Sequence, residues 1–272
     1  MFKIISKITI MKFLRYLVRK FNLFLKNTKY SLNYPVSIKL NTTKGSLKFQ
    51  AFSPVESYRI ADYGDEKFFV EKFTQLIVND DIVFDIGASV GLITLHSALF
   101  AKLGKVYSFE PDPDTMYRLK HNVSLNDFSN VVLVPKAVSD FVGVVSLFTD
   151  GSSGKAPTMR EQINRKGSPK TIITVPTTTL DSEILAGNLP LPTILKIDIE
   201  GAEYLCLNGS QMLLSGKLGN KPRLIFMELH PEFLPSFGTT WEVVHNFVLN
   251  QGYSIIWEQK RDNQIHYCYK PI

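Results

Sequence analysis

Asp85, Gly87 and Gly91 have the types and the spacing of residues that bind one end of a small charged ligand. Residues 82–84 before them form a short apolar run, typical of a strand buried in a parallel sheet, and residues 92–99 after them predict a helix. A strand, a tight glycine turn and a helix present helix N-terminal amides to a bound cofactor. Because glycine has no Cβ, the backbone at 87 and 91 can approach that cofactor closely.

The spacing favours S-adenosylmethionine (SAM) over a dinucleotide. A dinucleotide-binding turn reads G-x-G-x-x-G, and its middle glycine would fall at position 89, where this chain has Ser89. The chain has Asp-x-Gly-x-x-x-Gly instead, and a carboxylate at the strand end can hold the ammonium group of SAM. Glu110 ends the next predicted strand and suits the ribose hydroxyls of either ligand. Singly, Asp85 and Glu110 could be strand-end acids in turns, but together they indicate a ligand site.

Acidic residues and a histidine end two later predicted strands. Asp198 and Glu200 end one of them, while Glu228 and His230 end the other and share one face by the period of two. Ligands of a doubly wound sheet bind beyond the carboxyl ends of its strands, so these side chains should face the same crevice as Gly87. His230 is the first candidate for a general base because its unperturbed pKa lies near neutrality, followed by Glu200 and Asp198. The alternative for His230 is a half-buried structural histidine.

No metal ion is predicted from these residues. The acids offer oxygen ligands for a metal-assisted reaction, but no spacing among them demands an ion. Cys206 and Cys268 have neither a C-x-x-C partner nor histidines at zinc spacing, so we expect two buried free thiols.

Three parts of the chain must position these residues: a basic amphipathic helix at 1–30, an N-terminal extension packed on the core at 31–80, and a SAM-binding domain at 81–272. Strands and helices alternate in the last part, which predicts an α/β fold with a doubly wound, mostly parallel sheet. A hairpin at the end of the chain adds an antiparallel C-terminal strand. The loop at 150–170 is either disordered or a lid over the substrate.

The net charge of +6 comes from the first 30 residues, which hold eight of the 31 Lys and Arg residues and no acid. The remainder is near neutral, so we expect no nucleic-acid partner. Apolar residues of 1–30 share one helical face but are interrupted by charges too often for a membrane span. We expect a cytoplasmic protein in which this helix either contacts the membrane surface peripherally or packs on its own domain or on a second subunit of a homo-oligomer.

Five segments, in this order, resemble the FkbM family of SAM-dependent methyltransferases: Phe-Asp-Ile-Gly-Ala at 84–88, Phe-Glu-Pro at 109–111, Ala-Val-Ser-Asp at 137–140, Thr-Leu-Asp at 179–181 and Ile-Asp-Ile-Glu-Gly-Ala-Glu at 197–203. The resemblance covers roughly residues 60–235 and does not include the basic N-terminal helix. It implies the Rossmann-like fold of class I methyltransferases. It also implies methyl transfer, usually to an oxygen of a sugar, a glycolipid or a natural product.

The resemblance also implies roles for individual residues, in the order in which SAM would lie. The methionine end would be held by Asp85, Gly87, Ala88 and Gly91, and the ribose by Glu110. The adenine would lie near Ala137 and Asp140, and Asp198 would lie near the methyl group that is transferred.

The leading hypothesis is therefore an O-methyltransferase acting on a small-molecule, glycan or lipid-linked acceptor. A non-catalytic module that binds an adenosine ligand is one alternative, which the intact set of predicted binding residues disfavours. A nicotinamide oxidoreductase is another, and Ser89 disfavours it.

Overall fold

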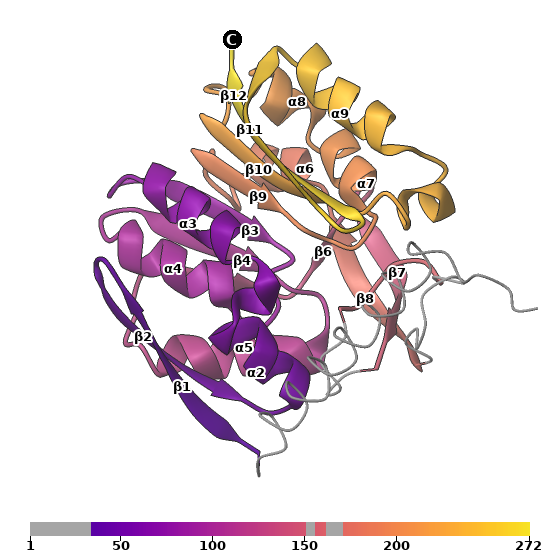
Figure 1. The fold of residues 1–272 in the computed structure, drawn as a ribbon. Coiled ribbons are helices and arrows are strands. Elements are labelled where there is room, and N and C mark those ends of the chain that lie inside the picture. The colour runs from indigo at the N-terminus through magenta and orange to yellow at the C-terminus, as the bar shows by residue number, and fades with distance from the viewer. Residues whose placement is uncertain (1–33, 151–155, 162–170) are drawn as a thin grey trace, which may run out of the picture.

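The computed structural model describes residues 34–150, 156–161 and 171–272 (Figure 1). Its centre is a seven-stranded sheet in the order β11-β12-β10-β9-β3-β4-β5. The strands are β3 (Ile82–Ile86), β4 (Lys105–Phe109), β5 (Val131–Val134), β9 (Ile194–Ile197), β10 (Leu224–Leu229), β11 (Tyr253–Arg261) and β12 (Gln264–Pro271). Only β12 runs antiparallel to its neighbours in this sheet. This confirms the predicted α/β sheet with one antiparallel C-terminal strand.

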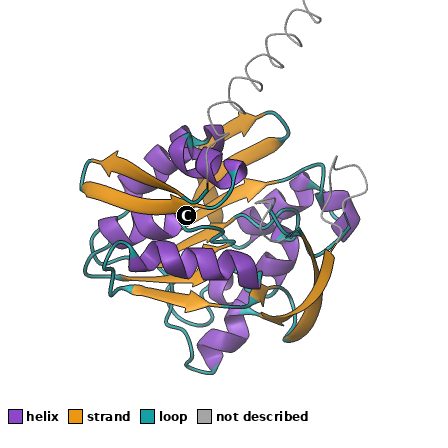
Figure 2. Cartoon of the chain, turned by 90° about the horizontal axis from the view of Figure 1, so that it is seen from below, coloured by secondary structure: helices purple, strands orange, loops and turns teal. Residues whose placement is uncertain are grey.

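Helices cover both faces of the sheet (Figures 1 and 2). Neighbouring strand residues such as Val83 and Phe84 point to opposite faces and enter different hydrophobic cores. One core lies under α3 (Lys67–Leu76) and α4 (Leu92–Phe100). The other lies under α6 (Leu180–Leu185), α7 (Glu203–Asn208), α8 (Gln211–Ser215) and α9 (Trp241–Asn250). Because apolar residues cover both faces, polar side chains concentrate at the carboxyl ends of the strands.

The segment before β3 packs on the first core. A hairpin of β1 (Val36–Thr42) and β2 (Gly45–Ala51) is followed by α2 (Pro54–Ala61) and the 3-10 turn η1 (Tyr63–Asp65). Leu47 and Phe49 of β2 are fully buried in that core. The hairpin also docks on α5 (Pro113–Ser124), whose Asn122 Oδ1 accepts from the Gln50 amide at 2.8 Å. The segment therefore shares its interior with the sheet, while the division of the chain into parts remains a prediction.

A second, three-stranded sheet stands beside the first, in the order β6-β8-β7. It consists of β6 (Ala137–Val138), β7 (Gly143–Thr149) and β8 (Thr171–Thr178). Strands β7 and β8 pair antiparallel, as the apolar runs at 144–149 and 172–178 on either side of the loop predict. The apolar residues at 131–138 alone predict one strand, but they form two strands, β5 and β6, in different sheets. Pro135 separates them, because it has no N–H to continue the ladder.

Two helix predictions also need correction. Residues 202–214 alone predict one helix, but the structure divides them into α7 and α8 at Gly209, where an added Cβ would lie 2.0 Å from the carbonyl oxygen of Ser139. Ser53 and Pro54 follow the apolar run at 47–52 and predict only the end of a strand, so the sequence pattern does not predict α2. They are the N-cap and first residue of α2: the Ser53 hydroxyl accepts from the Glu56 amide, and the Glu56 carboxylate accepts from the amide of Phe52. This is a variant of the capping box, in which Glu56 accepts from the amide one residue before the N-cap, and its Ser-x-x-Glu pattern is a local signal that the sequence already contains.

The predicted helix at 1–30 lies outside the described residues, as does most of the loop at 150–170. Within the part of the chain that is described, none of the helices has the length and apolarity needed to cross a membrane. Peripheral membrane contact through 1–30 therefore remains a prediction.

Replacing Ser53 by alanine should destabilise the protein. The change removes the side-chain acceptor at the N-terminus of α2, so the free energy of unfolding should fall by about 1 kcal/mol. Denaturant unfolding measures this value, with the exposed Ser37→Ala in β1 as a control that should stay within about 0.5 kcal/mol of the parent. Equal free energies of unfolding for Ser53→Ala and the parent would show that the Ser53 cap does not stabilise α2.

Candidate active site

A cavity of about 360 Å³ opens at the carboxyl ends of β3, β4, β9 and β10. This volume lies within the range of roughly 300–1,000 Å³ that is usual for cofactor and small-molecule sites. One wall is the glycine turn after β3, and another comes from α2, η1 and α3. The small sheet adds Ala137, Val138 and Leu147, and the loop between β7 and β8 adds Ala156, Pro157 and Met159.

The glycine turn lines the cavity at Gly87 and Ala88. Gly87 has φ +81°, and a Cβ there would lie 1.9 Å from the carbonyl oxygen of Asp198, so glycine is required where the end of β9 crosses the turn. The amides of Gly87 and Ala88 donate to the carbonyl of Phe109 at 3.0 and 2.9 Å, which fixes the turn to β4. Gly91 does not line the cavity; its φ of +99° and its packing against Leu119 explain the glycine there.

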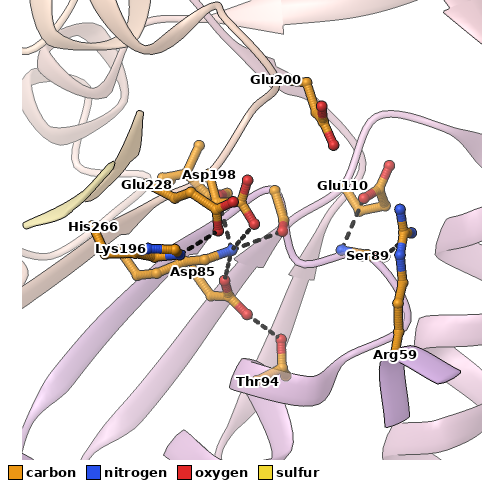
Figure 3. A network of polar contacts seen from close by, with 12 residues as sticks. Arg59, Asp85, Ser89, Thr94, Glu110, Lys196, Asp198, Glu200, Glu228 and His266 are labelled. Atoms are coloured by element: carbon orange, nitrogen blue, oxygen red, sulfur yellow. Dashed lines mark hydrogen bonds and ion pairs between the residues drawn. The ribbon is translucent and has the colours of Figure 1, made fainter. Parts of the chain in front are cut away.

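Asp85 is fully buried behind the turn and is not among the residues that line the cavity. Its Oδ1 lies 3.0 Å from the Lys196 ammonium, and its Oδ2 accepts from the Thr94 hydroxyl at 2.7 Å (Figure 3). Lys196 does line the cavity, and it also donates to the carbonyl of Gly87 at 2.9 Å. Burial alone would lower the pKa of Lys196, but Asp85 and Asp198 raise it, so the lysine is charged. Direct contact between Asp85 and a cofactor remains a prediction, and the geometry gives Asp85 a positioning role.

Glu110 lines the cavity at the end of β4 and is almost fully buried. Its two carboxylate oxygens accept from the amides of Ser89 at 2.9 Å and Asp112 at 3.0 Å. Each oxygen keeps a second lone pair for a ligand hydroxyl. Burial raises the pKa of Glu110 to about 7, against the lowering effect of those two amides. Figure 3 shows the Arg59 side chain beside this group, and its Nη1 lies 3.4 Å from the Ser89 hydroxyl oxygen.

The two predicted adenine contacts separate in the structure. Ala137 is buried and lines the cavity, together with its neighbour Lys136. Asp140 is exposed, is not among the lining residues, and accepts from the Ser139 hydroxyl at 3.1 Å. Any part that Asp140 plays in binding a cofactor remains a prediction.

The acids and the histidine that end β9 and β10 do come together. His230 is buried, its Nδ1 lies 2.9 Å from Glu203 Oε1, and its Nε2 lies 3.3 Å from Glu228 Oε1. Asp198 Oδ1 and Glu200 Oε2 lie 3.9 and 3.8 Å from the same Nε2. Asp198, Glu200 and Glu228 line the cavity, whereas His230 lies behind them.

The pKa values in this cluster change the expectation for His230. Burial alone would lower the pKa of His230, but the carboxylates of Glu200, Glu203 and Glu228 raise it well above its ordinary value. The imidazole is therefore protonated at neutral pH and cannot accept a proton, so the reason for choosing it as the base does not hold. Burial and the nearby Glu228 raise the pKa of Asp198 to about 7.

Several cavity residues were missed because they precede the predicted domain or follow its last parallel strand. Arg59 and Glu66 come from the extension, and Gln264 comes from β12. Glu66 forms an ion pair with Arg261 of β11, and its pKa is raised to about 8 by burial and by Glu228 and Asp198. No local pattern around Arg59 or Glu66 points to a site, since tertiary packing alone brings them to the cavity.

The sequence profile of the methyltransferase FkbM domain matches residues 85–255, more than half of the chain. The chain belongs to this family. The chain therefore carries the domain of a methyltransferase family, which supports SAM as the cofactor, as the sequence analysis predicts. The residues fit that cofactor, because a glycine turn, a buried carboxylate at Glu110 and an acid at Asp198 line one continuous cavity.

Two curated relatives are similar over part of their length. The chain is 28% identical over 162 residues to the hexuronic acid methyltransferase AglP of Haloferax volcanii, covering 60% of this chain and 63% of that protein. It is 32% identical over 82 residues to an uncharacterized protein of Methanocaldococcus jannaschii, covering 30% of this chain and 31% of that one. The chain thus spans less than two thirds of the length of either relative.

Solved structures are similar at lower identity. A methyltransferase FkbM from Methylobacillus flagellatus aligns with a TM-score of 0.46 and 16% identity, covering 71% of this chain and 44% of that chain. The fibrillarin of Aeropyrum pernix, solved with natively bound SAM, aligns with a TM-score of 0.47 and 11% identity, covering 88% and 84%.

Cofactor binding should depend on pH through Glu110. A ribose that donates to the ionised carboxylate must displace a proton below pH 7, so the affinity for S-adenosylhomocysteine should fall by up to about tenfold per pH unit below 7 and level off above it. Isothermal titration between pH 5.5 and 8.5 measures this. Glu110→Gln should weaken binding at pH 8 by about tenfold or more and flatten the profile.

The exposed Asp80→Asn, before the amino end of β3 and away from the cavity, is the control for this experiment and should keep the parent's profile. An unchanged slope in Glu110→Gln would mean that another group, such as Asp198, carries the pH dependence.

Proposed function

We propose that this FkbM-domain methyltransferase methylates a hydroxyl oxygen of a sugar, either free or within a glycolipid or natural product. The observation that supports this most is the acidic end of the cavity, where Asp198, Glu200 and Glu228 line the wall beyond the glycine turn and Glu110. Carboxylates accept hydrogen bonds from the several hydroxyls that a sugar presents. The name of the relative AglP, a hexuronic acid methyltransferase, points to the same class of acceptor.

The residues divide into a cofactor end and an acceptor end. At the cofactor end, Gly87 and Ala88 admit the methionine part and Glu110 receives the ribose. Lys196 holds the glycine turn in place, because it forms an ion pair with Asp85 and donates to the carbonyl of Gly87. When bound, SAM supplies a methyl group on a positively charged sulfur, which is already a strong electrophile.

At the acceptor end, the protein has to align a hydroxyl and take its proton. Asp198 and Glu200 line the cavity and can do both, because each presents a carboxylate there. His230 carries a proton and sits behind them, so its role is to hold these carboxylates in place. Alignment of the reacting atoms accounts for much of the rate enhancement in such a transfer.

Arg59 should hold the carboxylate of the cofactor's methionine part. It lines the cavity beside Ser89 of the glycine turn, and no carboxylate among the described residues forms an ion pair with it. Arg59→Ala should therefore weaken S-adenosylhomocysteine binding by about tenfold or more, the loss expected for a charged hydrogen bond. Titration with 5′-methylthioadenosine, which lacks the amino-acid part, is the matched control and should be unaffected. An equal loss for both ligands would refute this role.

The acceptor class is tested by incubating the protein with SAM and a panel of acceptors. The panel holds methyl glycosides of hexuronic acids, of neutral hexoses and of an amino sugar. A gain of one methyl group on the uronic or neutral sugars, located on oxygen by NMR, is expected. Asp198→Asn should lower turnover by about a hundredfold, the scale of a lost acid–base group, while keeping S-adenosylhomocysteine affinity.

Other outcomes would contradict the proposal. Methylation only at the amino sugar's nitrogen would show that the acceptor is an amine and not a hydroxyl. Tight cofactor binding without turnover on any member of the panel would favour the non-catalytic alternative.

A further inference from the structure

We propose that Asp198, Glu228 and His230 form a binding site for a divalent cation, best matched by Mn²⁺, at the acceptor end of the cavity. The sequence predicted no metal, because these residues show no ligand spacing along the chain. The topology supplies the spacing instead: Asp198 follows β9, and Glu228 and His230 lie at the end of the adjacent β10. This inference rests on the proposed function and adds to it an ion that would hold the acceptor hydroxyl.

The distances among the three residues suit a metal ion. One ligand atom from each lies within 4.8 Å of the others. His230 Nε2 is 3.3 Å from Glu228 Oε1 and 3.9 Å from Asp198 Oδ1. Two atoms that are each about 2.1 Å from an ion lie about 3.0 Å apart at a right angle and about 3.4 Å apart at a tetrahedral angle. Small side-chain rotations would therefore bring all three onto one ion, which would replace the proton on His230 Nε2.

The partner of the other imidazole nitrogen is a second, independent observation. His230 Nδ1 is held by Glu203 Oε1 at 2.9 Å, and Glu203 is itself fully buried and fixed by the amide of Gly201 at 3.0 Å. The ring also stacks on Phe233, with 5.6 Å between centroids. Histidines that bind metals nearly always donate their second N–H to a carboxylate in this way, which fixes the ring and directs the free nitrogen to the ion.

Two buried groups beside the site, His266 and Glu203, have incomplete hydrogen bonding among the described residues. His266 is fully buried, and neither of its ring nitrogens makes a hydrogen bond with the described residues. Its Nε2 points at Glu228 Oε2 from 3.3 Å, so Glu228 lies between two imidazoles. The other oxygen of Glu203 also has no hydrogen-bond partner within the described part of the chain. Buried polar atoms without a hydrogen bond are costly, so this end of the cavity suits a ligand that interacts with them.

A second group, formed by Glu66, Glu228 and His266, has similar ligand spacing and shares Glu228. We assign the ion to the first group because only there does a buried carboxylate support the histidine from behind. The amide nitrogen of Gln264 lies 3.4 Å from His230 Nε2, so the ion would replace that contact.

The ligand set also indicates which ion would bind. Two carboxylates suit Mg²⁺, Ca²⁺ or Mn²⁺, and the imidazole favours the transition-metal ion among these three. Three protein ligands leave coordination positions for an acceptor hydroxyl and water, and an ion in this place lowers the pKa of a bound hydroxyl. Glu200 would then remain beside the site, with Oε2 3.8 Å from His230 Nε2, as the carboxylate that receives the proton.

The full chain, treated with EDTA and then freed of chelator, is titrated with Mn²⁺ and followed by electron paramagnetic resonance, which detects the free ion. One bound Mn²⁺ per chain is expected. Glu228→Gln should weaken binding at least a hundredfold, and Glu203→Gln by about 10- to 100-fold as the loss of a supporting carboxylate. Glu71→Gln, an exposed acid of α3, is the control and should bind Mn²⁺ as the parent does.

Retained S-adenosylhomocysteine affinity shows that each variant is folded. Absence of Mn²⁺ binding up to millimolar concentrations, or undiminished binding by both Glu228→Gln and Glu203→Gln, would overturn the proposal.

Methyltransferase assays with EDTA and Mn²⁺ distinguish a failure of the metal site from a failure of the proposed function. Activity that EDTA abolishes and Mn²⁺ restores supports both. Full activity in EDTA would overturn the metal site and leave sugar methylation standing. Specific Mn²⁺ binding without methylation of any sugar would leave the metal site standing and overturn the acceptor class.

Discussion

The arrangement of the site depends on the buried ammonium of Lys196. It is surrounded by Asp85 at 3.0 Å, Asp198 at 3.7 Å and the carbonyl of Gly87 at 2.9 Å. A charge removed from water is tolerated only when it is paired and hydrogen-bonded, and removing one partner of such a pair typically costs about 3–5 kcal/mol. Because Lys196 lies on β9 while Asp85 ends β3, this one interaction fixes the glycine turn relative to the acids of the acceptor end.

The N-terminal extension is the second structural constraint, since it closes a cavity that the sheet alone would leave open. Glu56 of α2 forms an ion pair with Arg118 of α5, and Glu66 forms one with Arg261 of β11. One ion pair joins the extension to the helix that follows β4, and the other joins it to the edge strand β11. The cavity wall is therefore a product of tertiary packing, and its shape depends on elements more than 190 residues apart along the chain.

Local patterns were enough to predict the sheet, the glycine turn and Glu110, because each follows from strand and helix periodicity and from the position of a residue at a strand end. The same reasoning could have found α2, whose capping box is contiguous in sequence. It could not have found Arg59 or Glu66, since only the folded chain brings them to the cavity. The residue type of His230 suggests a base, whereas four carboxylates from the segment after β9, from β10 and from α7 leave it protonated.

The concentration of acids at the acceptor end has a physical consequence for any ligand that enters. Asp198, Glu200, Glu203 and Glu228 all approach one imidazole, and Lys196 is already shared with Asp85. Removing that much negative charge from water without compensation is unfavourable, so the site favours ligands that bring positive charge or several hydrogen-bond donors. A polyhydroxyl acceptor and a divalent ion both meet this requirement, and they do so together when the ion binds one of the hydroxyls. A neutral, donor-poor acceptor would leave the carboxylates without partners, which is the reason to look first among sugars.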